Sequence, residues 1–256
     1  MNLGVVLSGG GIRGVAHIGA LQAMEEFNLK PTHISGTSAG AIVGGLYAAG
    51  IECSEILKFF KTIPIFQRSR YARRKPGFID SEKFYDEFRN YMQKDDFSSL
   101  QTTLYVTATD LLKGTLKIFH EGELIRPILA SASFPGLFSP VEIGDSHYID
   151  GGVFNNFPVE PLRPVCDKII GVYVNPVKPV GIDKLKHSYN VVERAYKLKS
   201  AADSILKFKQ CDLVISPSDL SLFGTFDMKY TDAIYDIGYR ETKRLLEAKL
   251  EVLVNS

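Results

Sequence analysis

Residues 34–40 read Ile-Ser-Gly-Thr-Ser-Ala-Gly, a short strand-like run that breaks into Gly-x-Ser-x-Gly and continues into small helix-forming residues. In such a pattern Ser38 occupies a sharp turn between a strand and a helix, where Gly36 and Gly40 leave room for the backbone to double back. A helix over residues 41–49 would direct its free N–H groups and positive dipole end at that turn. We therefore interpret Ser38 as a nucleophile, the alternative being a serine N-cap in an ordinary loop.

A second glycine-rich stretch follows the buried strand that we expect over residues 3–7. Residues 9–14, Gly-Gly-Gly-Ile-Arg-Gly, have the G-x-G-x-x-G spacing of a dinucleotide-binding turn and precede a helix expected over residues 15–27. That fingerprint also needs a carboxylate about 20 residues later, at the end of the second strand. The strand expected around residues 32–35 leads instead into Gly-Thr-Ser. The stretch is better explained as a nest of backbone N–H groups at Gly9, Gly10 and Gly11 that holds an oxyanion, with Arg13 as a nearby cation.

A carboxylate at the end of a predicted strand is the second candidate for chemistry. The sequence favours a hairpin over residues 141–149 that turns at Gly144-Asp145 and ends in Asp150-Gly151-Gly152. Asp150 is either a catalytic group or a turn aspartate, which is a very common role.

The base that would activate Ser38 is not fixed by the motifs alone. In α/β-hydrolases the order along the chain is serine, acid, histidine. The only histidine after Asp150 is His187, at the start of an expected surface helix, and His147 lies in the hairpin. A two-residue site in which Asp150 takes the proton from Ser38 is simpler, provided that burial raises the pKa of Asp150 from about 3.9 towards the working pH.

Strands and helices alternate along the chain, which predicts one α/β domain over residues 1–256. If the first two strands are adjacent and parallel, the glycine-rich loop and Ser38 open onto the same carboxyl edge of the sheet. Further strands are expected over residues 103–109, 116–120, 168–175 and 213–216, and further helices over residues 52–61, 81–92, 123–130, 187–210 and 230–250.

The composition excludes several classes of function. Thirty basic and twenty-nine acidic residues give a net charge of +1, so no overall field attracts nucleic acid. Three widely spaced cysteines fit reduced thiols rather than a disulfide framework or a zinc site. The first residues do not have the pattern of a signal peptide, and no apolar run approaches a membrane span. We therefore expect a cytoplasmic protein that can contact a membrane surface, the alternative being export by a secretion system that needs no signal peptide.

One segment could bring the protein to a membrane surface. The apolar residues 63–66 follow a helix that carries Phe59 and Phe60, and they lead into five basic residues between Arg68 and Lys75. An apolar ridge beside basic residues suits a surface rich in anionic lipid, or these elements form a lid. The alternative is a solvated loop.

Several of these blocks together resemble the patatin-like phospholipases. The resemblance covers the chain to about residue 160 and rests on residues 9–14, 36–40, 108–111, 130–136, 150–152 and 156–158. It implies a three-layer α/β/α sandwich with a mainly parallel central sheet, Ser38 as nucleophile and Asp150 as base. It also implies an oxyanion site at Gly9, Gly10, Gly11 and Arg13, with Gly14, Gly36, Gly40, Gly151 and Gly152 as motif glycines. No metal and no cofactor are implied.

The activity implied by the resemblance is hydrolysis of fatty acyl esters in lipids through a Ser-Asp dyad and an acyl-enzyme. The substrate would be a lipid or another acyl ester, with transient contact to a membrane surface and no nucleic acid partner. Two alternatives stay open: a general carboxylesterase or thioesterase that uses the same dyad, and a lipid-binding module with a vestigial site.

Overall fold

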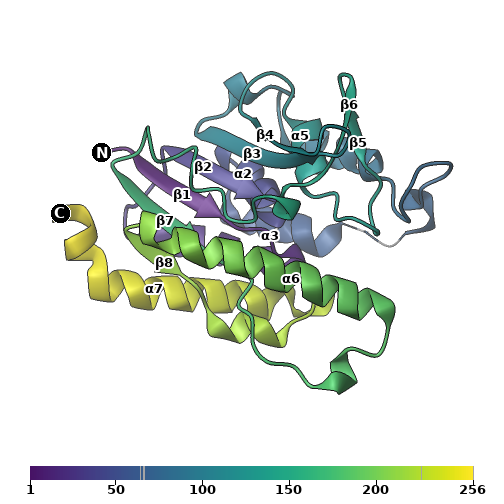
Figure 1. Ribbon diagram of the computed structural model, residues 1–256. Helices are drawn as coiled ribbons and strands as arrows, with labels where there is room; N and C mark the ends of the chain where they lie inside the picture. Colours follow the sequence, from purple (N-terminus) through teal and green to yellow (C-terminus); the bar gives the residue numbers. More distant parts are fainter. Residues whose placement is uncertain (64, 66, 226, 256) are drawn as a thin grey trace.

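The computed structural model describes residues 1–63, 65, 67–225 and 227–255, and its centre is an eight-stranded sheet (Figure 1). The strand order is β5-β6-β3-β2-β1-β7-β8, and β4 also pairs with β3. Five strands run parallel: β1 (Leu3–Leu7), β2 (His33–Thr37), β3 (Thr103–Asp110), β7 (Lys168–Val172) and β8 (Leu213–Ile215). Three are antiparallel to their neighbours: β4 (Thr115–Phe119), β5 (Val141–Ile143) and β6 (Ser146–Asp150).

The first strand lies in the middle of this sheet, which decides where the site forms. β1 pairs in parallel with β2 on one side, in a register that sets Leu7 beside Gly36, and with β7 on the other side. Carboxyl ends of neighbouring parallel strands open at the same edge of a sheet. The glycine-rich loop after β1 and the serine turn after β2 are therefore neighbours, as the sequence predicts.

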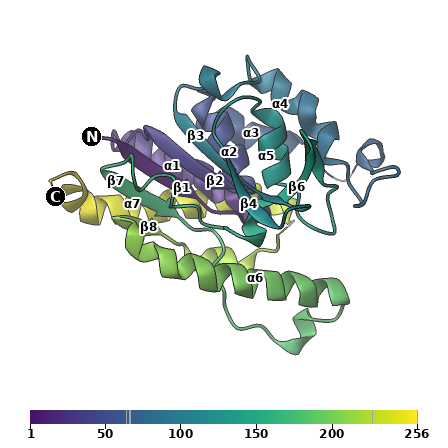
Figure 2. The ribbon, with the colours of Figure 1, turned by 45° about the horizontal axis from the view of Figure 1, so that its top comes forward.

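Helices cover both faces of the sheet (Figures 1 and 2). One face carries α1, α2, α3, α5 and α7, and the opposite face carries α6. The bounds are α1 (Val15–Glu26), α2 (Ala39–Ala48), α3 (Cys53–Thr62), α4 (Tyr85–Tyr91), α5 (Ile125–Ser131), α6 (Ser188–Lys207) and α7 (Thr231–Asn255). The three-layer α/β/α arrangement with a mainly parallel sheet is confirmed.

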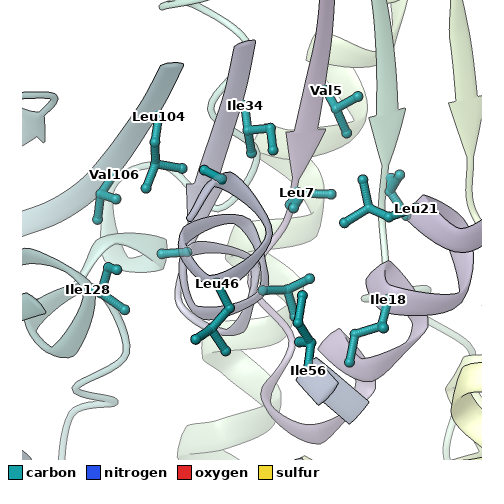
Figure 3. Packing of buried hydrophobic residues seen from close by; sticks show 14 of the residues in the cluster. Val5, Leu7, Ile18, Leu21, Ile34, Leu46, Ile56, Leu104, Val106 and Ile128 are labelled. Carbon is teal, nitrogen blue, oxygen red and sulfur yellow. The ribbon is translucent and has the colours of Figure 1, made fainter. Parts of the chain in front are cut away.

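Side chains of β1 alternate between two apolar clusters, as expected of a strand that is buried on both faces. Val5 and Leu7 pack with α1 and α2 in the larger cluster, part of which is shown in Figure 3. Val6 points the other way, into a smaller cluster with Phe157 and Tyr173. Phe208, directly after α6, packs against both of these aromatic rings and completes the second cluster. Its ring centroid lies 5.4 Å from that of Phe157 and 5.2 Å from that of Tyr173.

Several predicted bounds differ from the structure by a few residues; helix α7, for example, ends at Asn255 instead of residue 250, and helix α6 ends at Lys207 instead of residue 210. Helix α2 begins at Ala39 instead of residue 41, because the turn at Ser38 leads directly into it. Strand β7 ends at Val172, three residues before the predicted end. The helix expected over residues 81–92 begins as a 3₁₀ turn (Ser81–Phe84), where the Asp80 side chain accepts from the Glu82 amide at 3.2 Å, and continues as α4.

The segment predicted to meet a membrane is only partly exposed. Phe59 and Phe60 are 2% and 9% exposed, so this side of α3 is a wall of the interior and not a lipid-facing ridge. Pro64 and Phe66 lie outside the described residues. Among the basic side chains, Arg70 pairs with Glu87, and Lys75 pairs with Asp80 and Glu82, whereas Arg68, Arg73 and Arg74 are exposed.

No helix in the described ranges is long and apolar enough to cross a bilayer.

Candidate active site

Ser38 occupies a strained turn between β2 and α2. Its backbone has φ 55° and ψ −125°, a conformation that residues with a side chain rarely adopt and that costs about 1–3 kcal/mol. The glycines on either side allow the close approach: a Cβ on Gly36 would lie 2.6 Å from the Gly40 carbonyl oxygen, and one on Gly40 would lie 2.1 Å from that of Leu7. The hydroxyl is thus presented at the edge of the sheet, ahead of the N-terminus of α2.

The backbone amide of Ser38 is fixed by a residue that sequence reasoning did not assign. It donates to the Ser131 hydroxyl at 2.8 Å, and Ser131 is the last residue of α5. Ser131 belongs to the small-residue run at 130–136, one of the blocks that carry the resemblance. Two residues further on, the Ser133 carbonyl accepts from the Asp150 amide at 3.0 Å. This run therefore contacts both halves of the candidate site.

Two of the three glycine amides in the glycine-rich loop are left without an acceptor among the described residues. The Gly9 amide donates to the Asn156 carbonyl at 3.2 Å, while the amides of Gly10 and Gly11 have no acceptor within the described ranges. Gly9 lies against Ser38, since a Cβ on it would be 3.1 Å from the Ser38 Cβ. Gly11 has φ +59°, and a Cβ there would lie 2.4 Å from the Thr225 carbonyl oxygen. Only glycine fits this backbone.

Arg13 supports the loop from behind. Its guanidinium is 4% exposed, and its Nε donates to the Gly10 carbonyl at 3.2 Å. Burial lowers the pKa of Arg13 to about 10, an effect opposed by the nearby Glu193, so the side chain stays cationic at neutral pH. Arg13 thus contacts the backbone of the loop, and a direct contribution to an oxyanion stays a prediction.

Asp150 ends β6, which pairs with β3 in a register that sets Asp150 beside Ala108. The carboxylate is 2% exposed, and its Oδ1 accepts from the Gly152 amide at 2.8 Å. Burial raises the pKa of Asp150 to about 6, and the Ser38 hydroxyl, the Gly152 amide and the Tyr196 hydroxyl, which all lie near the carboxylate, oppose that rise. The group is a carboxylate at neutral pH and a far stronger base than an exposed aspartate.

A tyrosine from α6 faces the same carboxylate, and no sequence motif points to it. The Tyr196 hydroxyl is buried without a hydrogen bond of good geometry to any described residue, and it lies near both Gly152 and Asp150. Burial, together with the Asp150 charge, raises the pKa of Tyr196, so it remains a protonated donor. The helix is attached to the Asp150 loop because Ser200 donates to the Gly152 carbonyl at 3.2 Å and Lys199 to that of Val153 at 3.0 Å.

The five histidines all lie in the described ranges, and none of them hydrogen-bonds there to Ser38 or Asp150. His17 is fully buried, and its Nε2 contacts the Ser8 carbonyl at 2.7 Å. Burial lowers the pKa of His17 to about 4, which keeps the ring neutral. His120, His147 and His187 are exposed. The geometry therefore favours a two-residue site over a triad.

An apolar cavity of about 900 Å³, which includes its part open to solvent, begins at Ser38. Gly11 and Ala39 line it beside the serine, and Ile12, Ile42 and Leu129 extend its wall. Six phenylalanines dominate the remainder: Phe59, Phe60, Phe84, Phe88, Phe134 and Phe138. Such a lining excludes water and accepts a hydrocarbon chain.

The residues of the site are not arranged as metal ligands. No group of three or more His, Cys, Asp or Glu side chains in the part of the chain that the structure describes is close enough to hold a metal ion.

The chain is thus an α/β protein with a strained serine turn at the carboxyl edge of a mainly parallel sheet. A family model described as patatin-like phospholipase matches residues 5–163, so the chain belongs to that family, and the resemblance seen in the sequence is confirmed.

Two relatives support this assignment. An uncharacterized NTE family protein of Mycobacterium tuberculosis is 34% identical over 177 residues, which are 67% of this chain and 48% of the relative. Lysophospholipase NTE1 of Debaryomyces hansenii is 31% identical over 183 residues, 69% of this chain but 12% of that protein. The chain thus spans about half the length of the mycobacterial relative and a small part of the yeast one.

Solved structures share the fold at low sequence identity. The crystal structure of VipD from Legionella pneumophila matches with a TM-score of 0.60 and 16% identity, covering 96% of this chain and 67% of VipD. The type III effector protein ExoU matches with a TM-score of 0.50 and 18% identity, covering 97% of this chain and 53% of ExoU.

Proposed function

We propose that the protein hydrolyses fatty acyl esters of lipids, with Ser38 as nucleophile and Asp150 as general base. The observation that carries the proposal is the arrangement of these two groups: a serine on a strained turn, within reach of a buried carboxylate whose pKa is raised to about 6, at one end of an apolar cavity. A buried carboxylate that bonds a nearby hydroxyl is suited to remove its proton.

The reaction proceeds in two steps. Ser38 Oγ attacks the ester carbonyl while its proton passes to Asp150, and the alcohol or lysolipid leaves with that proton. Water then attacks the acyl-enzyme, Asp150 accepts a proton from the water, and the fatty acid is released as Ser38 regains its hydrogen. Covalent catalysis of this kind divides one difficult step into two easier ones.

The negative charge on the carbonyl oxygen needs donors that are already in place. The amides of Gly10 and Gly11, which have no acceptor among the described residues, are our candidates for these donors. Gly11 lines the cavity together with Ser38, and the N-terminus of α2 adds its positive dipole end. Loss of one such donor typically costs about 100-fold or more in turnover. Because Gly11 has φ +59° and contacts Thr225, Gly11→Ala should displace the loop and reduce turnover at least as much.

The apolar cavity favours a long acyl chain over a short acid. The yeast relative is named a lysophospholipase, and we propose the same substrate class here, namely phospholipids or their monoacyl derivatives. A carboxylesterase or thioesterase would use the same dyad, and activity that rises sharply when the substrate forms micelles would favour the lipid hydrolase.

The proposal is tested by fatty acid release from diacyl phospholipids, monoacyl phospholipids and short nitrophenyl esters. Ser38→Ala and Asp150→Asn should each abolish release, and a fluorophosphonate should label the wild type but not Ser38→Ala. Because Asp150 must be ionised to act as a base, kcat/KM should fall as the pH drops below about 6.

Three results would overturn parts of this assignment. Activity that survives Asp150→Asn but is lost in His147→Ala or His187→Ala would indicate a triad. Hydrolysis confined to short esters or thioesters would remove the lipid substrate. Failure of the wild type to react with both esters and the fluorophosphonate would favour a binding module with a vestigial site.

A further inference from the structure

Helix α6 carries an apolar stripe on the side that faces away from the sheet. Seven side chains of this side are apolar, and all are exposed: Val191, Val192, Ala195, Leu198, Ala202, Ile205 and Leu206. We call them the α6 outer face. Five of the stripe positions follow a spacing of 4, 3, 4 and 3 residues, which places them in one line along the helix. At 1.5 Å per residue the stripe is about 22 Å long.

This stripe is not the usual scatter of single apolar side chains over a surface. In the described chain seventeen large apolar side chains are exposed, and five of them lie on α6, with exposures of 47–70%. Two more, Val180 and Ile182 at 45% and 85%, lie in the segment before the helix. In Figures 1 and 2 the helix runs along the periphery of the molecule. A continuous apolar surface of this kind marks an interaction site.

The charge around the stripe identifies the kind of partner. Residues 178–209 contain eight Lys or Arg and three Asp or Glu, a net charge of +5 in a chain whose total is +1. Lys197 and Lys199 pair with acidic residues of the same helix, but Lys178, Lys186 and Lys209 are exposed and form no ion pair with a described residue. The surface is therefore apolar along its centre and positive around it.

We propose that the α6 outer face docks on the surface of an anionic lipid membrane. An amphipathic helix with an apolar stripe and basic flanks lies in the plane of such an interface, with its apolar side chains between the lipid headgroups. A second copy of the chain fits less well, because it would bring two sets of the exposed lysines Lys178, Lys186 and Lys209 together, and like charges repel. The choice of lipid rests on the proposed function.

The position of α6 gives the docking a consequence for the site. Its inner side carries Tyr196 against Asp150, together with Ser200 and Lys199, which bond the loop of residues 151–153. Docking through the outer face therefore brings a membrane within one helix diameter, about 10–12 Å, of the segment that holds the proposed base.

The experiment measures flotation of the full chain with vesicles in a Ser38→Ala background, so that hydrolysis cannot alter the lipid. Vesicles of phosphatidylcholine mixed with phosphatidylglycerol are compared with phosphatidylcholine alone. The test variant is Leu198→Glu with Ile205→Glu, and the matched control is Leu111→Glu with Leu112→Glu, which changes two apolar residues of similar exposure on the β3–β4 turn.

We expect binding to the anionic vesicles that the test variant weakens about tenfold or more and the control leaves within about twofold. Raising the salt from about 0.1 M to about 1 M should also weaken it, because the Debye length falls from about 10 Å to about 3 Å. The circular dichroism spectrum should be unchanged in the test variant. When the same two substitutions are made in a chain that keeps Ser38, hydrolysis of a water-soluble short ester should also be unchanged.

Equal binding of the test variant and the wild type, or no binding of the wild type, would overturn the docking proposal. So would a dimer in sedimentation equilibrium that the test variant dissociates while vesicles stay unbound, because the face would then be an interface between copies. If vesicle binding follows the expected pattern but no ester is hydrolysed, the docking surface stands and the proposed function fails.

Discussion

Asp150→Asn should remove activity and at the same time change how the stability of the protein depends on pH. Burial raises the pKa of Asp150 from 3.8 to about 6, so the folded state binds the proton more tightly than the unfolded state does. The free energy of unfolding of the wild type therefore decreases as the pH rises between these two values. A shift of about two pH units corresponds to about 3 kcal/mol, which is the cost of holding the buried group ionised. Asparagine carries no charge and does not bear this cost.

The two pKa values set the size of this change in stability between pH 5 and pH 8. With a pKa of 3.8 in the unfolded state and about 6 in the folded state, binding of the proton to Asp150 adds about 1.4 kcal/mol to the free energy of unfolding at pH 5 and almost nothing at pH 8. The stability of Asp150→Asn relative to the wild type should therefore rise by about 1.4 kcal/mol from pH 5 to pH 8. The absolute difference also contains the burial of the new amide group, but that part does not change with pH. Urea unfolding at both pH values measures the difference.

Asp110→Asn is the matched control, since Asp110 ends the neighbouring strand β3. Its carboxylate accepts from the Ser146 hydroxyl at 2.5 Å and from the amides of Leu112 and Lys113, and the Ser146 bond is the largest cause that lowers the pKa of Asp110. A lowered pKa stabilises the fold above the normal value of 3.8, so this substitution should destabilise the protein by an amount that stays nearly constant between pH 5 and pH 8 and shrinks only at lower pH. A difference between Asp150→Asn and the wild type that stays constant from pH 5 to pH 8 would refute the raised pKa of Asp150 and the reasoning built on it.

Three further variants separate the roles of the remaining side chains. Tyr196→Phe removes a hydroxyl that lies near the Asp150 carboxylate and lowers its pKa, so the acid limb of the kcat/KM profile should move to higher pH, with a loss of about threefold or more at pH 6 and less at pH 8. An acid limb that does not move would leave Tyr196 with a packing role only. Ser38→Gly should be as inactive as Ser38→Ala but more stable by about 1–2 kcal/mol in urea, because glycine adopts φ 55° without strain, and equal stabilities would contradict that strain. Arg73→Glu with Arg74→Glu should weaken binding to anionic vesicles without changing short-ester hydrolysis, and unchanged vesicle binding would remove this segment as a membrane contact.

The parts of the site that follow strand ends can be predicted from the sequence. A buried parallel strand is a short apolar run, and the residues after it must lie at the carboxyl edge, so the sequence alone predicts that the glycine-rich loop and Ser38 are neighbours. Asp150 is recognised for the same reason, because it ends a strand and is followed by two glycines. The raised pKa of Asp150 cannot be predicted from the sequence. The burial that causes it depends on how distant segments pack around the carboxylate.

The residues that fix these groups cannot be found in the same way. The Ser131 hydroxyl accepts a hydrogen bond from the Ser38 amide, and the Asn156 carbonyl accepts one from the Gly9 amide of the glycine-rich loop. Both contacts join segments about 90 or more residues apart, and they depend on side-chain and loop geometry that no local pattern encodes. The sequence therefore predicts a nest with three donors, whereas in the structure the Gly9 amide already donates to Asn156.

Helix α6 shows why its contact with the site escapes sequence reasoning. In most surface helices the apolar stripe faces the core, and the polar side faces water. Here the long apolar line is exposed, whereas the side against the sheet carries Tyr196, Ser200 and Ser204, and Ser200 bonds the Gly152 carbonyl. A sequence prediction that places the apolar stripe against the sheet would therefore orient Tyr196 away from Asp150. The reversed polarity has a physical reason on each side, because a buried carboxylate needs polar neighbours, and a lipid surface needs apolar ones. Helix α6 thus places polar side chains beside the proposed dyad on its inner side and apolar side chains on the proposed docking surface on its outer side.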